Sequence, residues 1–271
     1  MTDISAPPRQ ALGIGLEEFE YPYPVGFFPV TSDLQSLTMA YMDVPPSSTP
    51  NGSTAVLMHG KAFGGYYFLN VIEALTAAGY RVVAPDQLGW GKSSKPDIHY
   101  SFQLFAANTA ALLDHLGVGK VSVLGHSTGG MTATRFTLMN PSRVTHLVLE
   151  DPLGLVDYRP GIPPQSEETL YDHEVHWTDP DTIRNYVAGY FVHPDPKVWE
   201  PLAEVLGARN AEPGLPALGA CCGTHFSDDL PAAGPLRIFA DRPADVAGCR
   251  RRGPRRPARA VRRAGRTRET W

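Results

Sequence analysis

The sequence predicts an α/β fold in which helices cover a doubly wound, mostly parallel sheet, and three observations support this. Short apolar runs alternate with segments whose apolar residues have helical spacing. The chain has 271 residues, 42% of them hydrophobic, which is enough for one large domain of this class. A Gly-x-Ser-x-Gly motif follows one of the apolar runs, at residues 125–129. Such a motif is typical of a sharp turn from a strand into a helix.

The expected elements begin with two strands and then alternate between strand and helix. Strands are expected at residues 26–30, 37–44, 55–58, 80–84, 121–124 and 144–149. Helices are expected at residues 68–78, 101–116 and 131–139. The run at 55–58 is continuously apolar, which is typical of a buried parallel strand. The helix at 101–116 is amphipathic, and its expected inner side carries Phe102, Phe105, Ala106, Leu112 and Leu113.

Changes in composition divide the chain into four parts. Residues 1–25 are expected to be an irregular lead, and residues 26–151 form the expected α/β core. Residues 152–214 are rich in Pro, Tyr, Trp and His, with a helical patch at 182–190, and are expected to form a lid. Residues 215–271 are rich in Arg, Pro and Ala without a helical or strand period, so we expect a poorly ordered tail.

Charge is distributed unevenly along the chain. The formal net charge is −4, but ten arginines lie between residues 250 and 268. Residues 1–248 carry 14 basic and 27 acidic side chains, a net charge of −13. We expect a small-molecule substrate as partner and no nucleic acid. We also expect no membrane as partner, because no apolar run approaches the roughly 18 residues of a membrane span. The polar start predicts no signal peptide and hence a cytoplasmic location. Nothing in the sequence indicates the oligomeric state.

No metal and no organic cofactor are expected. The cysteines show neither a zinc-ligand spacing nor a disulfide framework: Cys221, Cys222 and Cys249. The histidines of the expected lid also fit no metal-ligand spacing, although two acids lie near them: His173, His176, His193, Asp172 and Glu174. The Gly-x-Gly at residues 89–91 lacks a Gly-Lys-Ser/Thr at P-loop spacing, which favours a structural loop over a phosphate site.

Ser127, at the centre of the Gly-x-Ser-x-Gly motif, is the expected nucleophile. The turn requires small residues two positions before and after the serine, and it exposes the serine hydroxyl above the sheet. The backbone N–H groups of Thr128 and Lys61 are expected to form an oxyanion hole for a tetrahedral intermediate. Lys61 belongs to a Gly-rich turn after the strand at 55–58. The alternative for that segment is an ordinary strand-to-helix turn.

A serine nucleophile needs a histidine base and an acid that orients the base. Asp151, at the end of the strand at 144–149, is a candidate acid. His59 precedes the Gly-rich turn and is expected to brace that loop, although it could also be a base. His126 lies beside Ser127 and is expected to have a packing role. His225 is the one histidine beyond the expected lid.

Several motifs resemble the α/β-hydrolase fold superfamily: HGKAF at 59–63, APDQLGWGKSSKP at 84–96, YSFQ at 100–103, GHSTGG at 125–130 and DPLGL at 151–155. The resemblance covers about residues 20–214 and is nearest to the haloalkane-dehalogenase and epoxide-hydrolase-like branch. Those enzymes proper carry Asp at the nucleophile position, so Ser127 implies an esterase, a C–C hydrolase or a perhydrolase. The resemblance also implies an acid in a Gly-x-x-Asp-Arg loop after the next-to-last strand, and a histidine after the last strand.

Neither of these two elements follows Gly214 in this reading frame. Reading each codon one base later from Leu215, with free choice of synonymous codons, permits a string that contains the family-like segments QPV-x-YEF, PTLLVVG and GAEDR. The acid would then be encoded across the codons of Gly253 and Pro254. We therefore expect a frameshift, in the gene or in its sequencing, and a chain that is inactive or weakly active as written. The alternatives are a non-catalytic truncated product or small-molecule-binding protein, or a genuine basic tail that binds nucleic acid or anionic surfaces.

Overall fold

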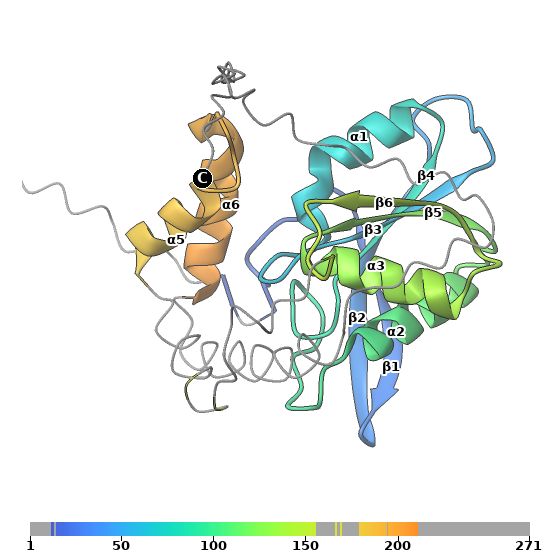
Figure 1. Cartoon of the computed structure of the whole chain (residues 1–271), viewed down its shortest axis with the longest axis horizontal. Coiled ribbons are helices and arrows are strands. Elements are labelled where there is room, and N and C mark those ends of the chain that lie inside the picture. The colour runs from blue at the N-terminus through green and yellow to red at the C-terminus, as the bar shows by residue number, and fades with distance from the viewer. Residues whose placement is uncertain are drawn as a thin grey trace, which may run out of the picture.

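A six-stranded sheet forms the centre of the molecule (Figure 1). The computed structural model describes residues 12–13, 15–155, 166, 169, 179–193 and 195–210. The strands lie in the order β1-β2-β4-β3-β5-β6. Their bounds are β1 (Val25–Ser32), β2 (Gln35–Val44), β3 (Thr54–Met58), β4 (Arg81–Pro85), β5 (Val121–His126) and β6 (Val144–Glu150). The expected tail at 215–271 lies outside the described residues.

The sheet is parallel from β4 to β6, where a helix connects each strand to the next along the chain. Strand β3 pairs in parallel with both β4 and β5, and β5 pairs in parallel with β6, whereas β1 and β2 add antiparallel strands beside β4. The expected mostly parallel α/β sheet is therefore confirmed. After β4 the chain crosses to the other side of β3, and ligands in open α/β sheets bind at the carboxyl ends of strands where the order reverses in this way. The ends of β3 and β5 are thus the expected place for a site.

Helices cover both faces of the sheet. Helix α1 (Leu69–Ala77) follows the short 3₁₀ helix η1 (Gly65–Phe68) on one face. The other face carries α2 (Phe102–His115) and α3 (Thr128–Met139), which pack against each other. Alternate residues of β3 face the two layers, because Val56 and Met58 belong to the cluster of α2 and α3, and Ala55 and Leu57 to that of α1.

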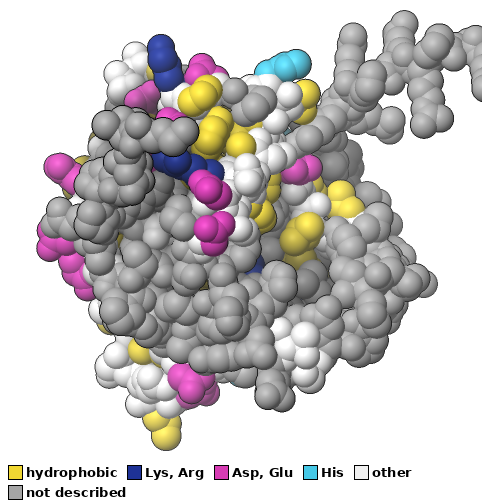
Figure 2. Space-filling model, turned by 90° about the vertical axis from the view of Figure 1, so that its left-hand side faces the viewer, with side chains coloured by type: hydrophobic (Ala, Val, Ile, Leu, Met, Phe, Trp, Pro, Cys, Tyr) yellow, Lys and Arg dark blue, Asp and Glu magenta, His cyan; other side chains and the backbone are white. Residues whose placement is uncertain are grey.

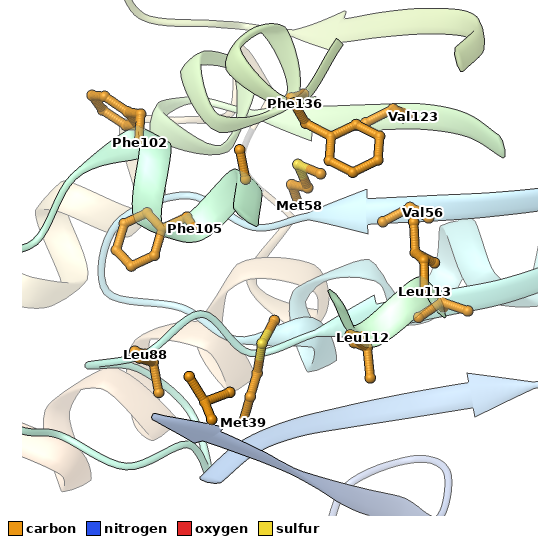
Figure 3. Packing of buried hydrophobic residues seen from close by; sticks show 14 of the residues in the cluster. Met39, Val56, Met58, Leu88, Phe102, Phe105, Leu112, Leu113, Val123 and Phe136 are labelled. Atoms are coloured by element: carbon orange, nitrogen blue, oxygen red, sulfur yellow. The ribbon is translucent and has the colours of Figure 1, made fainter. Parts of the chain in front are cut away.

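The larger core cluster is shown in Figure 3. It joins Phe102 and Phe105 of α2 and Phe136 of α3 to Met58 of β3 and Val123 of β5. Each of these five side chains is at most 4% exposed. All five side chains expected on the inner side of α2 are buried, which confirms the amphipathic pattern read from the sequence: Phe102, Phe105, Ala106, Leu112 and Leu113.

The helix boundaries show local signals. Helix α2 begins after Ser101, whose Oγ accepts a hydrogen bond from the Leu104 N–H at 3.1 Å. Helix α3 begins at Thr128, three residues before the predicted start, because the turn at Ser127 leads directly into it. Helix α5 (Pro180–Ala188) begins two residues before the predicted patch, after a cap in which Asp179 Oδ2 accepts from the Thr182 N–H at 2.7 Å.

Helix α6 (Pro196–Asn210) was not predicted from the sequence. It contains Pro201, and a proline inside a helical pattern normally argues against a helix. Helices α5 and α6 pack side by side at one end of the molecule (Figure 1). Figure 2 looks onto that end, where hydrophobic side chains lie beside acidic and basic ones. None of the helices in the described ranges is long and apolar enough to cross a membrane.

Candidate active site

Ser127 occupies the sharp turn between β5 and α3. Its backbone has φ 56° and ψ −121°, a conformation that costs a non-glycine residue free energy and that persists only where its surroundings impose it. The Ser127 N–H donates to the Glu150 carbonyl at 3.1 Å, and the Ser127 carbonyl accepts from the N–H groups of Gly130 at 2.9 Å and Leu153 at 3.2 Å. The turn is therefore held by backbone hydrogen bonds on both sides. This geometry matches the nucleophile elbow that the Gly-x-Ser-x-Gly motif predicts.

The glycines around Ser127 are required by close backbone approaches. A Cβ on Gly125 would lie 2.3 Å from the Gly129 carbonyl oxygen, and a Cβ on Gly129 would lie 2.0 Å from the Met58 carbonyl oxygen. Both distances are far below any real contact. The start of α3 consequently packs directly on the end of β3, and this contact brings the loop after β3 beside Ser127.

That loop carries Lys61, the second expected donor of the oxyanion hole. A Cβ on Gly60 would lie 3.0 Å from the Ser127 Cβ, so the backbone of the loop runs along the serine side chain. Thr128 is the first residue of α3, and the N–H groups of a first helical turn have no acceptor within their helix. The structure therefore brings together the three residues that the sequence predicts as nucleophile and oxyanion-hole donors.

His59 fixes the orientation of this loop. Its Nε2 accepts a hydrogen bond from the Gln87 N–H at 2.9 Å, so the ring proton is on Nδ1, which donates to the Gly60 carbonyl at 2.8 Å. Because a trans peptide group is planar, the Gly60 carbonyl and the Lys61 N–H point in opposite directions. The bond from His59 thus sets the direction of the Lys61 N–H. Both ring nitrogens are engaged with backbone groups, which confirms the bracing role predicted for His59 and removes it as a base.

Asp86 holds the glycine-rich turn from the other side. Its carboxylate is completely buried and accepts hydrogen bonds from the Gly65 N–H at 2.6 Å, the Lys92 N–H at 2.7 Å and the Tyr21 hydroxyl at 2.7 Å. Burial first, and then the negative charge of Asp86, raise the pKa of Tyr21, so the hydroxyl keeps its proton and remains a donor. Asp86 therefore has a structural role in the loop after β4.

His126, the residue before Ser127, also lies beside the loop that contains Lys61, because a Cβ on Gly60 would lie 3.0 Å from its Nδ1. Its ring stacks on Tyr67, with centroids 4.4 Å apart and planes 14° apart, and its Nδ1 has no hydrogen-bond partner among the described residues. Burial lowers the pKa of His126 to about 4, against a smaller opposing effect of the Asp151 charge, with His59 lowering it slightly further. The ring is therefore neutral at physiological pH, in agreement with its predicted packing role.

Asp151, the candidate acid, follows the end of β6 directly. Its backbone has φ 43°, and the preceding residue, Glu150, accepts the Ser127 N–H through its carbonyl. Burial, followed by the charge of Asp151, raises the pKa of Glu150. Burial also raises the pKa of Tyr67, with smaller effects of Glu150 and Asp151. The structure thus places Asp151 at the rim of the elbow, on the side of His126.

A small pocket opens beside the elbow. The pocket is shallow and half open, and its space is about 200 Å³ when the open solvent at its mouth is counted. Both expected oxyanion-hole residues line it, together with His59, Gly60, Gln87, Trp90, Phe105 and Thr132. Four of these residues come from the loop after β4 and from α2 and α3. The sequence analysis did not predict Gln87, Trp90, Phe105 or Thr132 as site residues, because only the topology brings these segments together.

Helices α5 and α6 cover the loop that contains Lys61. Ala62 is buried in a cluster with Ile183 and Val187 of α5 and Leu206 of α6. Tyr190, which follows α5, lies 6.0 Å from the His126 ring and 6.4 Å from the Phe63 ring, measured between centroids, and its hydroxyl bonds to that of Tyr186. Among the described residues, no group of three His, Cys, Asp or Glu side chains is placed to hold a metal ion.

Comparison with known proteins defines the class of protein. The family model of the alpha/beta hydrolase fold matches residues 56–207. The chain therefore belongs to the α/β-hydrolase fold family, and the resemblance seen in its motifs is confirmed. The match includes the turn at Ser127, the loop that contains Lys61, helix α5 and helix α6 as far as residue 207.

Individual relatives give the same result. A crystal structure of a probable hydrolytic enzyme from Pseudomonas aeruginosa PAO1 is 39% identical, with a TM-score of 0.75, over 82% of this chain and 72% of that one. A haloalkane dehalogenase of Mycolicibacterium paratuberculosis is 33% identical over 48% of this chain and 43% of its own length. A 2-hydroxy-6-oxononadienedioate/2-hydroxy-6-oxononatrienedioate hydrolase of Dechloromonas aromatica is 43% identical over 35% of each chain. The matches thus span less than half the length of these two curated relatives.

Proposed function

We propose that this protein is a serine hydrolase that cleaves an ester, another acyl bond or a C–C bond of a small molecule. The observation that carries the proposal is the strained backbone of Ser127, φ 56°, at the end of β5. A strained residue persists where the surrounding structure imposes it, and this turn is the kind that exposes a serine hydroxyl, which supports the proposal. The family membership supports the same chemistry.

The proposed reaction has two stages. The Ser127 Oγ attacks the carbonyl carbon of the substrate while a base takes its proton, and the N–H groups of Lys61 and Thr128 stabilise the negative oxygen that forms. The leaving group departs with a proton, which yields an acyl-enzyme. Water then attacks the acyl carbon, and Ser127 recovers its proton as the acid product leaves. No metal or organic cofactor takes part.

The base and the acid complete the proposal. His59 has both nitrogens engaged with backbone groups, and the buried His126 ring stacks on Tyr67, so neither is suited to serve Ser127 as base. We assign the histidine to a segment encoded in the shifted frame after Leu215, together with the acid of a Gly-x-x-Asp-Arg loop. Asp151 is the alternative acid, because it lies at the rim of the elbow. As written, the chain then turns over esters slowly or not at all.

We assign residues 152–214 to a lid over the site and residues 26–151 to the catalytic core. The cluster that joins α5 and α6 to Ala62 supports the assignment, since it places the two helices over the oxyanion loop. Lid residues such as Tyr190 would then select the substrate. We propose the cytoplasm as the location of the protein. We propose a small molecule as its substrate, and neither nucleic acid nor a membrane as its partner.

Two experiments test the function. The gene is sequenced across the codons of Gly214 and Leu215, and the chain as written and the chain that the shifted frame encodes are both assayed with p-nitrophenyl acetate. The shifted chain should hydrolyse the ester, and Ser127→Ala should reduce its kcat by roughly 10⁴- to 10⁶-fold. An ordinary rate in the chain as written, abolished by Ser127→Ala, would show that an in-frame base exists. If the shifted chain has no activity, the frameshift hypothesis loses its main functional support. A non-catalytic small-molecule-binding protein is then favoured over a serine hydrolase.

A further inference from the structure

The side-chain amide of Gln87 is buried and only half satisfied. Gln87 is 3% exposed, and its Nε2 donates to the Thr109 hydroxyl at 3.3 Å. Within the part of the chain that the structure describes, the Oε1 of the same amide has no hydrogen-bond partner. A buried polar atom without a partner costs on the order of 1–3 kcal/mol, so such an atom normally has an occupant that supplies the bond.

The location of Gln87 indicates where that occupant comes from. Gln87 lines the pocket that Lys61 and Thr128 also line, and its backbone N–H holds His59. Two aromatic side chains, Trp90 and Phe105, also line the pocket. If Lys61 and Thr128 bind the carbonyl oxygen of the substrate, the groups nearest to Gln87 are the substituents on the adjacent carbon of the acyl chain.

We propose that Gln87 forms a polar subsite that binds a hydroxyl group on the acyl side of the substrate, next to the scissile carbonyl. A hydroxyl both donates and accepts, so it pairs with either end of the amide, whichever end faces the pocket. Thr109 can likewise serve as acceptor or donor for the other end. The proposal rests on the proposed function, because it takes the pocket as the place of the acyl group. Gln87 would thus favour 2-hydroxyacyl substrates over acyl groups of the same size without a hydroxyl.

Binding of two matched amides tests this subsite without any turnover. N-phenylglycolamide and N-phenylpropionamide differ only by a hydroxyl in place of a methyl group, and their binding to the full chain is measured by saturation-transfer NMR. The glycolamide should bind about 10- to 100-fold more tightly, because a site built for a hydroxyl rejects the analogue that lacks it. Gln87→Met, which keeps the backbone N–H to His59, should abolish the preference.

The matched control is Asn108→Leu. The amide nitrogen of Asn108 also has no partner among the residues that the structure describes, but Asn108 does not line the pocket, so this variant should keep the preference of the wild type. Equal binding of the two amides, binding of neither, or a preference that survives Gln87→Met would overturn the proposal.

Hydrolysis separates this proposal from the proposed function. In a chain that turns over esters, kcat/KM is compared for phenyl glycolate and phenyl propionate. Hydrolysis that depends on Ser127 but shows no preference for the glycolate ester would overturn the Gln87 subsite alone. An amide-binding preference that depends on Gln87, in a protein whose hydrolysis does not depend on Ser127, would overturn the serine hydrolase alone.

Discussion

The two buried histidines next to the Ser127 turn, His59 and His126, are held in different ways. Both are 3% exposed, but His59 has hydrogen bonds at both ring nitrogens, whereas His126 stacks on Tyr67 and its Nδ1 has no partner within the described part of the chain. Hydrogen bonds are directional, and stacking tolerates small rotations. His59 therefore fixes the direction of the Lys61 N–H, which the proposed chemistry requires, whereas His126 fills space beside Tyr67 and Tyr190.

The largest effect on stability is expected where the start of α3 meets the end of β3. This contact brings the loop that contains Lys61 beside Ser127. Gly129→Ala would place a Cβ 2.0 Å from the Met58 carbonyl oxygen, and backbone must move to accommodate it. The free energy of unfolding should fall by on the order of 3 kcal/mol or more. Thermal or urea unfolding measures it, with Gly119→Ala as the control, because a Cβ there has no neighbour within 4 Å. Equal stability of the two variants would contradict the packing described.

The comparison of the two histidines predicts unequal effects on rate. In a chain that turns over p-nitrophenyl acetate, His59→Phe removes the donor to the Gly60 carbonyl and loosens the Lys61 N–H. Because one oxyanion-hole donor contributes about 10²- to 10³-fold, kcat should fall by about 100-fold with little change in KM. His126→Phe keeps the stacking on Tyr67 and should change kcat by less than about threefold. A similar loss of kcat in His59→Phe and His126→Phe would contradict the different roles assigned to the two histidines.

The third prediction uses pH to test that His126 is buried as a neutral ring. The pKa of His126 is about 4 in the folded protein and ordinary in the unfolded chain, so the unfolded chain binds the extra proton. The contribution of the neutral His126 ring to the free energy of unfolding is therefore fully present above about pH 6.5, and it is lost as the pH falls from 6.5 toward 4. Between pH 7 and pH 5 the wild type should lose about 2 kcal/mol more stability than His126→Phe. Urea unfolding at both pH values measures this difference, and parallel curves would show that His126 is not buried as a neutral ring.

Much of the fold could be predicted because its signals are local. The strands of the parallel sheet lie within two residues of their predicted bounds, since each is a short apolar run. Helix α6 could not be predicted, because Pro201 argues against a helix and the packing of α5 and α6 on Ala62 is a tertiary contact. Tertiary packing outweighs the local propensity there.

The candidate site could be predicted only where it follows a motif. Ser127, Thr128 and Lys61 belong to sequence motifs, and the structure brings them together, although their catalytic roles stay predictions. Gln87 and Phe105 reach the pocket only because the fold brings the loop after β4 and helix α2 to the same place as Lys61 and Thr128, which a linear pattern does not show. The predicted domain boundaries and the role of Asp151 likewise stay predictions.

One measurement tests the central claim most directly. The chain that the shifted frame encodes is mixed briefly with p-nitrophenyl acetate, quenched in acid and digested, and the peptide that carries an acetyl group is identified by mass spectrometry. The account predicts a single acetyl group on Ser127, absent from Ser127→Ala and released by water on longer incubation. Acetylation of lysines alone, with the peptide of Ser127 unmodified, would contradict the assignment of Ser127 as the nucleophile.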